Sequence, residues 1–369
     1  MKPAHVSDES LAGERRVVLS CGQKDFTVRD VLDTSWFRGD LQVDWDHLLY
    51  AQACEQVADE SGLEAEDEIL QSMSEEFRYE RELLTAEETE RWLAAHDLNE
   101  EDFTNYFVRR YWGNHSKCEV EPPKTDFPAA KPELFELLHV DLVLSGHFDR
   151  HATSLSWRLA ALSECGKTQE FSLAEAEQGE RLRFLERNGY TEMGMTDALA
   201  GLERDLQWLS GCLQMEGAYR LICGQVLGDE QRARLLAALR LPLTRIEVET
   251  MVVQSPDAAN EAVLCLRENQ STMSELAREC GSVSEQRRVF LGDCSENMQQ
   301  ALLSSAPGDV LAPQREEDVF VVCRLISKTE PSLTDGEVVT QLDERLLQTH
   351  FSDLTRERVR WAKGWEQIQ

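Results

Sequence analysis

The first part of the chain places short apolar runs ahead of a long stretch of helical periodicity. Residues 16–32 read RVVLSCGQKDFTVRDVL, which predicts a short strand, a turn at Gly22, a second short strand and a helix with Thr27 as its N-cap. Apolar residues then recur every three or four positions to about Tyr111. Within this stretch Thr85–Glu88 is a capping box, so a helix begins there. We therefore expect this part to be mainly helical.

A proline-rich segment separates this part from a second helical region. Residues 116–133 contain four prolines and no periodicity, which predicts a linker. Helical periodicity resumes at 134 and continues to about 240. A last helical pattern runs from Gly336 to about Trp365, with an apolar stripe that needs a partner surface. We expect this C-terminal helix to pack against an earlier part of the chain.

Between the second helical region and the last one, the pattern changes to alternating strands and helices. In order, residues 243–331 show the strand-like run RIEVETMVV at 245–253, a helical stretch at 258–280, a turn region ending at Gly292, a short amphipathic segment, PGDVLAP at 307–313 and the strand-like run VFVVCRL at 319–325. This order of elements resembles the parvulin family of peptidyl-prolyl isomerases. The resemblance implies an α+β fold, in which mostly helical N-terminal modules accompany a small parvulin-like α/β domain with a short antiparallel sheet and a C-terminal helix.

The resemblance also locates a site. In parvulins two strand histidines form the floor, beside a Cys or Asp, while a Met and a Phe hold the proline ring. Aligned backward from Pro331, by the aliphatic run at 251–253 and by counting back from Gly308, this chain carries other residues there, and a one-residue slip of the first strand would replace Thr250 by Glu249. The implied peptide-binding groove consists of Thr250 and Val321 at the histidine positions, Val283 near the Cys or Asp position, Cys294 and Met298 in the proline pocket, and Phe290 and Phe320 beside it.

The missing imidazoles bear on whether this domain is an enzyme. No histidine occurs between Ala152 and Thr349, so no small shift of the alignment restores the pair. Rotation about an X–Pro bond has a barrier of about 18–20 kcal/mol, and valine and threonine cannot replace two packed imidazoles. The resemblance therefore implies an apolar groove that binds a peptide and isomerises it weakly or not at all. Catalytic residues stay unknown.

A second resemblance concerns the N-terminal helices. The runs FRYERELLT at 77–85 and ERWLAAHDLNEEDF at 90–103 are similar to the helical module that precedes parvulin domains in periplasmic outer-membrane chaperones and related foldases. There the module forms a cradle for extended polypeptide, which makes Trp92, Phe103 and Phe107 candidate peptide contacts. The same aromatic residues are also typical of a plain hydrophobic core. Both interpretations stay open.

Together these patterns divide the chain into five parts. They are an N-terminal helical chaperone-like module at 1–115, a linker at 116–133, a second helical module at 134–240, a parvulin-like domain at 241–331, and a C-terminal helix at 332–369 that packs back on the N-terminal module. Whether the second helical module repeats the first is left open by the few matching positions.

Composition limits the environment of the protein. No apolar run approaches the roughly 18 residues of a membrane-spanning helix, so membrane insertion is not expected. The N-terminus is polar and lacks the apolar core of a secretory signal. The ten cysteines include no Cys-x-x-Cys pair, which favours free thiols in a reducing compartment over disulfides or zinc. A cytoplasmic location is the resulting expectation.

The charge is strongly acidic and unevenly spread. The formal net charge is −31, which disfavours nucleic acid and anionic lipid as partners. Between Glu55 and Asp102 there are 18 acidic residues and three arginines, about half of the excess. This run is either a solvated helical surface or a face that attracts a basic peptide.

The densest group of histidines is His139, His147 and His151. On a helix His147 and His151 share a face, and Asp149 lies nearby, a spacing that a metal site uses. The glutamate of a His-Glu-x-x-His motif and a fourth ligand are missing, so we interpret these histidines as structural. No nucleotide or nucleophile motif is present, and we expect neither cofactor nor metal.

Three functions stay in competition. The favoured one is a chaperone or adaptor that binds an extended peptide and, by resemblance to accessory factors of small bacterial peptides, assists the maturation or export of a precursor. The alternatives are an active peptidyl-prolyl isomerase with an altered site and an acidic scaffold that recruits a processing enzyme. The client peptide and the oligomeric state cannot be read from the sequence.

Overall fold

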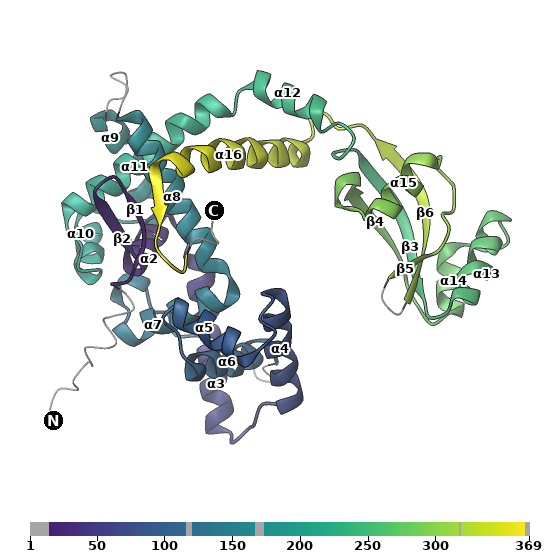
Figure 1. The fold of residues 1–369 in the computed structure, drawn as a ribbon, viewed down its shortest axis with the longest axis horizontal. Helices are drawn as coiled ribbons and strands as arrows, with labels where there is room; N and C mark the ends of the chain where they lie inside the picture. Colours follow the sequence, from purple (N-terminus) through teal and green to yellow (C-terminus); the bar gives the residue numbers. More distant parts are fainter. Residues whose placement is uncertain (1–14, 116–119, 167–172, 317–318, 366–369) are drawn as a thin grey trace. The chain divides into compact units, whose positions relative to one another are not determined.

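The computed structural model describes residues 15–115, 120–166, 173–316 and 319–365, and its fold is α+β. Helices predominate, and two small antiparallel sheets accompany them (Figure 1). The described chain forms two compact units, with unit 2 at 224–349 and unit 1 made of the residues before and after it. The chain passes from one unit to the other within two helices, α11 and α16.

Unit 1 contains a three-stranded sheet and most of the helices. Its elements are β1 (Val17–Cys21), β2 (Lys24–Thr27), α2 (Val28–Arg38), α3 (Gln42–Glu60), α4 (Asp67–Glu80), α5 (Ala86–Ala95), α6 (Glu100–His115), η1 (Phe127–Ala129), α7 (Pro132–Ser145), α8 (His147–Cys165), α9 (Leu173–Asn188), α10 (Glu192–Gly201), α11 (Leu206–Val226) and β7 (Val359–Trp361). Both helical regions of the sequence contribute to one hydrophobic core here, from Val18 to Trp365. The five-part division of the sequence stays a prediction.

The first elements form as the sequence predicts. Gly22 has a φ of +64° and starts the two-residue turn between β1 and β2, a conformation that glycine adopts without strain. Thr27 caps α2 in a full capping box with Asp30, and Thr85 caps α5 in the same way with Glu88. The sequence signals for the strands, the turn and both helix starts are therefore confirmed.

Unit 2 contains a four-stranded antiparallel sheet in the order β4-β3-β6-β5. Its elements are α12 (Asp229–Ala238), β3 (Arg245–Val253), α13 (Pro256–Arg267), α14 (Met273–Glu279), β4 (Ser284–Phe290), η2 (Leu291–Asp293), α15 (Glu296–Ser304), β5 (Gln314–Glu316), β6 (Val319–Thr329) and most of α16 (Gly336–Arg358). The first and last of the long strands, β3 and β6, pair directly at the centre.

Alternating side chains give this sheet two different faces. On one face Met251, Val253 and Val322 pack against α13 and α14, and we call it the α13 face. On the other, Val248 and Cys323 pack against η2 and α15, and we call it the site face. Because side chains alternate along a strand, the register decides which residues of β3 and β6 meet on each face.

Two sequence predictions about these elements were wrong. The predicted turn region before Gly292 contains the strand β4, whose polar residues lie at the edge of the sheet. The C-terminal helix was expected to reach about Trp365, but α16 ends at Arg358 and the chain continues as β7. There β7 pairs with β1, so backbone pairing in the sheet prevails over helical periodicity. Among the described helices, none is both long and apolar enough to span a membrane.

Candidate functional site

The site face of unit 2 brings the two predicted histidine positions together. Thr250 on β3 lies directly opposite Cys323 on β6, and the next residue pair on that face is Val252 with Val321. Thr250 and Val321 are therefore diagonal neighbours on adjacent strands. The floor so formed carries a hydroxyl, a thiol and valine side chains.

Cys323 adds the thiol that lies between the two positions. It is buried, and burial together with nearby Cys294 raises its pKa to about 12. The thiol is therefore protonated at neutral pH and neither attacks nor ionises. Burial also raises the pKa of Cys294 above its usual value. This floor offers weak hydrogen bonding and apolar contact, and it has no group that titrates near neutrality.

Cys294 and Met298 lie beside the floor of the site face. Both pack against the cluster that includes Cys323, Leu325 and Val248 on the site face. Ser295 caps α15 by accepting a hydrogen bond from the backbone of Met298, which fixes the start of the short helix. The helix thereby holds Met298 against the sheet.

The other three predicted groove residues lie elsewhere or apart. Phe320 points to the α13 face and packs with the α13–α14 cluster. Phe290 packs with Leu243 and Val338, with the Arg245 guanidinium 5.3 Å from its ring centre. Met298, Phe290 and Phe320 thus belong to three separate clusters and do not form one pocket. Val283 is 73% exposed and directly precedes β4.

Part of the site face stays open. Val252 is 38% exposed, and with Val283 it presents apolar surface at one end of the sheet. An ion pair between Glu285 and Arg287 (2.6 Å) borders this surface along β4. Within the described residues β4 pairs only with β3, so its outer backbone edge carries no partner strand. Exposed apolar side chains and the edge strand β4 therefore lie at the same end of the sheet.

In unit 1 the predicted cradle residues gather around Phe77. Its ring contacts those of Trp92, Phe103 and Phe107 at centroid distances of 5.4, 5.2 and 6.0 Å. The guanidinium of Arg81 covers the ring of Phe77 at 3.9 Å. Phe77 and Phe107 are buried, and the other two rings are half-buried. The three residues are brought together as the hydrophobic core of α4–α6, and their role as peptide contacts stays a prediction.

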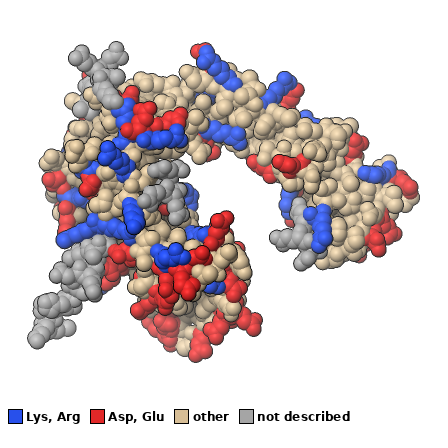
Figure 2. Space-filling view, in the orientation of Figure 1, with Lys and Arg blue, Asp and Glu red and all other residues tan. Residues whose placement is uncertain are grey.

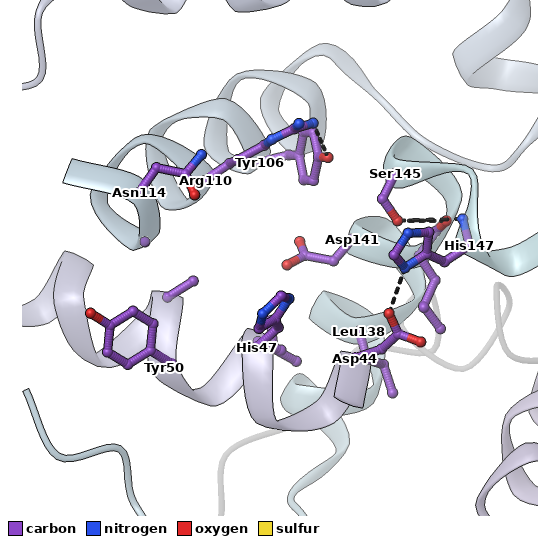
Figure 3. Close-up of a pocket in the computed structure, with 14 residues that line it drawn as sticks. Asp44, His47, Tyr50, Tyr106, Arg110, Asn114, Leu138, Asp141, Ser145 and His147 are labelled. Carbon is purple, nitrogen blue, oxygen red and sulfur yellow. Dashed lines mark hydrogen bonds and ion pairs between the residues drawn. The ribbon is translucent and has the colours of Figure 1, made fainter. Parts of the chain in front are cut away.

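Unit 1 also contains a cavity of about 410 Å³ between α3, α6 and α7 (Figure 3). His47 comes from α3, Arg110 from α6, and Asp141 from α7 points into the space between these helices. Arg109, itself buried, forms an ion pair with Asp141. Burial raises the pKa of Asp141, and this ion pair opposes the shift.

The second carboxylate of the cavity binds two histidines. Asp44 on α3 hydrogen-bonds His147 Nδ1 at 2.5 Å and His151 Nε2 at 2.9 Å, both from α8. Burial alone would raise the pKa of Asp44, but the bonds from His151 and His147 lower it below the usual value. Both carboxylates of the cavity are therefore engaged by protein groups. The arrangement joins α3 to α8 and supports the structural interpretation of these histidines.

No metal centre is formed by the described residues. In the part of the chain that the structure describes, no group of three or more His, Cys, Asp and Glu side chains could hold a metal ion. His147 and His151 share a helix face, as their spacing predicts, but their partner is Asp44 rather than Asp149.

Comparison with known proteins gives a faint likeness only. No protein-family model and no curated protein matches the chain. Among solved structures it is similar to the peptidylprolyl isomerase PrsA of Bacillus cereus, at 10% identity and a TM-score of 0.35 over 59% of this chain and 85% of the other. It is also similar to PrsA of Bacillus anthracis, at 12% identity and a TM-score of 0.29 over 55% and 94%. For the foldase protein PrsA of Streptococcus pneumoniae the values are 10%, 0.27, 63% and 93%. At such TM-scores we draw no functional conclusion from the likeness.

Two features of the candidate sites were missed by sequence reasoning. Cys323 was counted only among the free thiols, although it lies two positions after Val321 and therefore on the same face of β6. Asp44 carried no sequence signal, because its histidine partners lie more than a hundred positions further along the chain. Only the packing of α3 against the start of α8 brings these groups together.

Proposed function

We propose that the protein binds extended polypeptide on the site face of unit 2, as a chaperone or adaptor with a degenerate parvulin-like domain. The observation that carries the proposal is the open apolar end of this face, with Val252 and Val283 exposed beside the free edge of β4. Strand edges bind extended chains through backbone hydrogen bonds, and neighbouring apolar side chains add affinity.

The residues at the floor of the site support binding without efficient isomerisation. Thr250, Cys323 and Val321 occupy it, and the thiol of Cys323 is protonated at neutral pH. No histidine occurs in unit 2. Desolvation of the bound amide is then the main means by which this surface lowers the rotation barrier. An active isomerase with an altered site is the alternative that an activity assay separates.

The proposed client is a basic precursor peptide in the cytoplasm. The chain carries a net charge of −31, and Figure 2 shows Asp and Glu side chains gathered over the part of unit 1 formed by α3–α6. Such a surface attracts a basic segment and accelerates its encounter. The ten cysteines without a Cys-x-x-Cys pair support a reducing compartment.

Fluorescence anisotropy with a labelled, lysine-containing Ala-Pro peptide tests this proposal. Val252→Glu places a carboxylate on the exposed apolar surface and should weaken binding at least tenfold, because a desolvated charge without a partner is costly. Leu264→Glu is the matched control, since Leu264 is 58% exposed on α13, which packs on the opposite face. Equal affinity of both variants and the parent chain would remove the site face as the binding surface.

Two further arms separate the alternatives. Exchange NMR on the same peptide should give the uncatalysed rate of cis–trans exchange, whereas a clear acceleration would favour the isomerase. Repeating the titration at about 0.05 and 0.5 M salt tests the acidic surface. Strong loss of affinity at high salt, unaltered by Val252→Glu, would identify the acidic scaffold as the better description.

A further inference from the structure

The last described residues of the chain, 359–365, pack against unit 1 in a defined position. After β7 pairs with β1, the backbone N–H of Ala362 donates to the Val18 carbonyl at 2.9 Å. Gly364 follows with a φ of +97°, and a Cβ there would lie 2.8 Å from the Ala95 carbonyl oxygen. Only glycine therefore lets the chain pass this point and insert Trp365, which is 1% exposed, into the core.

Trp365 is held by aromatic rings and one cation. Its ring meets Phe148 at 4.7 Å and the edge of His96 at 4.9 Å. The Arg16 guanidinium lies 5.7 Å above the ring centre and donates hydrogen bonds to the Ala95 and Lys363 carbonyls on either side. Phe148 also packs edge-on against His139, at 5.5 Å. Two buried histidines thus share the core that receives Trp365.

The buried polar atoms of this core disfavour a charged imidazole. Within the described residues neither His139 Nε2 nor Trp365 Nε1 has a hydrogen-bond partner. His96 Nδ1 bonds the Trp92 carbonyl at 2.7 Å. Burial, followed by His96 and Arg16, lowers the pKa of His139 to about 4, and burial also lowers the pKa of His96. Both rings are therefore neutral at pH 7.

The charged side chains that shift the pKa values of the two rings are cationic, although two carboxylates lie nearby. Arg16 faces both of them, and Arg81 acts on His96 from the end of α4. Asp97 is a carboxylate that acts on Arg16. On α7 itself Glu136 lies one turn before His139, and its buried Oε1 has no hydrogen-bond partner in the described chain. A proton on either ring consequently adds charge to an aromatic core that already contains a cation.

We propose that His139 and His96 form a proton-operated latch, in which the neutral imidazoles hold Trp365 and their protonation releases residues 359–365 while the rest of unit 1 stays folded. Release would uncover the edge of β1 from Leu19 to Cys21, to which β7 is paired. It would also expose the aromatic surface around Phe148. A free strand edge beside an apolar hollow is a binding surface for an extended chain.

Proton linkage fixes the direction and size of the effect. An exposed His139 has a pKa near 6.5, and in the closed latch its pKa is about 4. Between these values the released state binds more protons, so the closed state loses stability as the pH falls from about 6.5 to about 4. Each pH unit changes the ratio of the released to the closed state about tenfold. Over this pH window the ratio changes about 300-fold for His139 alone.

Fluorine NMR of the full chain labelled with 5-fluorotryptophan tests the latch. The Trp365 resonance is assigned by its loss in Trp365→Phe. We expect it to move to a solvent-exposed position between pH 6.5 and 4, while the far-UV circular dichroism and most other tryptophan resonances stay unchanged. His139→Phe occupies about the same space without a titrating group and, because His96 still titrates, should move the transition to lower pH. His115→Gln, at an exposed histidine of α6, should leave it intact.

Contrary outcomes are equally clear. The latch would be overturned if the chemical shift of Trp365 keeps its buried value down to pH 4. It would also be overturned if this shift changes only together with global unfolding. A pH transition in His139→Phe equal to that of the parent chain would overturn it as well. If His139→Phe fails to fold at pH 7.5, His96→Gln replaces it, and this variant should shift the midpoint to lower pH by removing one of the two protonation sites. An unchanged midpoint there would reject the proposal.

Discussion

Asp44 illustrates how a single side chain gains its role from residues distant in sequence. One carboxylate bridges His147 and His151 and so connects α3 with α8 beside the cavity of unit 1. The exposed neighbour Asp46 has the same chemistry, and its bond among the described residues comes from Gln42 in its own helix. Two aspartates only two positions apart are therefore expected to contribute differently to the stability of the fold.

This contrast gives a stability prediction. Asp44→Ala should lower the free energy of unfolding by about 1.5–3 kcal/mol, because two hydrogen bonds to a charged group are lost and His151 stays buried. Asp46→Ala should change the free energy of unfolding by no more than about 0.5 kcal/mol. Urea unfolding monitored by tryptophan fluorescence measures both. Equal effects would show that the bridge contributes no net stability.

The same bridge has a definite pH dependence. Because the folded-state pKa of Asp44 lies below its usual value, the carboxylate stabilises the fold at pH values above the unfolded pKa of about 3.9. This contribution is lost as the pH falls through the lowered folded value. The difference in unfolding free energy between the parent chain and Asp44→Ala should therefore shrink below about pH 4, as acid titration of the urea midpoint would measure. A difference that grew in acid would contradict the assignment.

Single residues also show where sequence alignment reaches its limit. Thr250 and Val321, which the alignment assigned to the two histidine positions, lie on one face of the sheet in the structure. Phe290 and Phe320 were expected in the same groove as Met298, yet each packs into its own cluster. The orientation of Phe320 follows from the alternation of side chains along a strand. Because it is the direct neighbour of Val321, it points to the opposite face.

At the scale of elements, the local signals at helix starts were reliable. The capping boxes of α2 and α5 involve residues three positions apart, so the chain itself supplies both partners. A third box, Thr272 with Glu275, starts α14 in the same way. Such boxes depend little on the rest of the molecule.

A cap substitution should therefore have a local and modest effect. Thr85→Ala removes the side chain that accepts from the Glu88 N–H and should lower the free energy of unfolding by about 1 kcal/mol. Thr104→Ala, inside α6 and exposed, should be neutral or slightly stabilising, since alanine favours helices. Urea midpoints of the two variants decide the matter. A loss at Thr104 as large as that at Thr85 would contradict the capping role.

Strands with little apolar alternation were the elements that sequence reasoning missed. β4 is an edge strand with the sequence SEQRRVF, so it lacks the apolar alternation by which a half-buried strand is recognised. β7 is only three residues long and takes its conformation from its partner β1. Neither strand has a signal of its own, since both are defined by the strand beside them.

At the scale of the molecule, unit 2 is inserted into unit 1. The chain leaves unit 1 within α11, returns within α16 and then supplies β7 and Trp365 to the first unit. All eight tryptophans lie at positions 36–208 and 361–365, outside unit 2. Tryptophan fluorescence therefore reports on unit 1 alone. The unfolding of unit 1 can thus be followed separately from that of unit 2.

Truncation after Arg358 tests this organisation. Losing β7 and the buried Trp365 should destabilise unit 1 by at least the roughly 3–5 kcal/mol of a large core deletion, so its fluorescence transition moves to lower urea. The reciprocal control is Leu325→Ala, in the core of unit 2, which should leave the fluorescence transition in place. A fluorescence transition that Leu325→Ala shifts as strongly as the truncation would show that the units unfold as one.

The sequence by itself determined the helix starts, the first hairpin, the long strands β3 and β6 of unit 2 and the absence of histidine from that unit, because each depends on neighbouring residues or on composition. Only the tertiary structure decided which face each residue occupies, that Asp44 meets His147 and His151, and that Gly364 and Trp365 close unit 1 beside His96 and His139. These contacts join residues far apart in sequence. Strand register, helix packing and burial fix them, and no local pattern encodes those quantities.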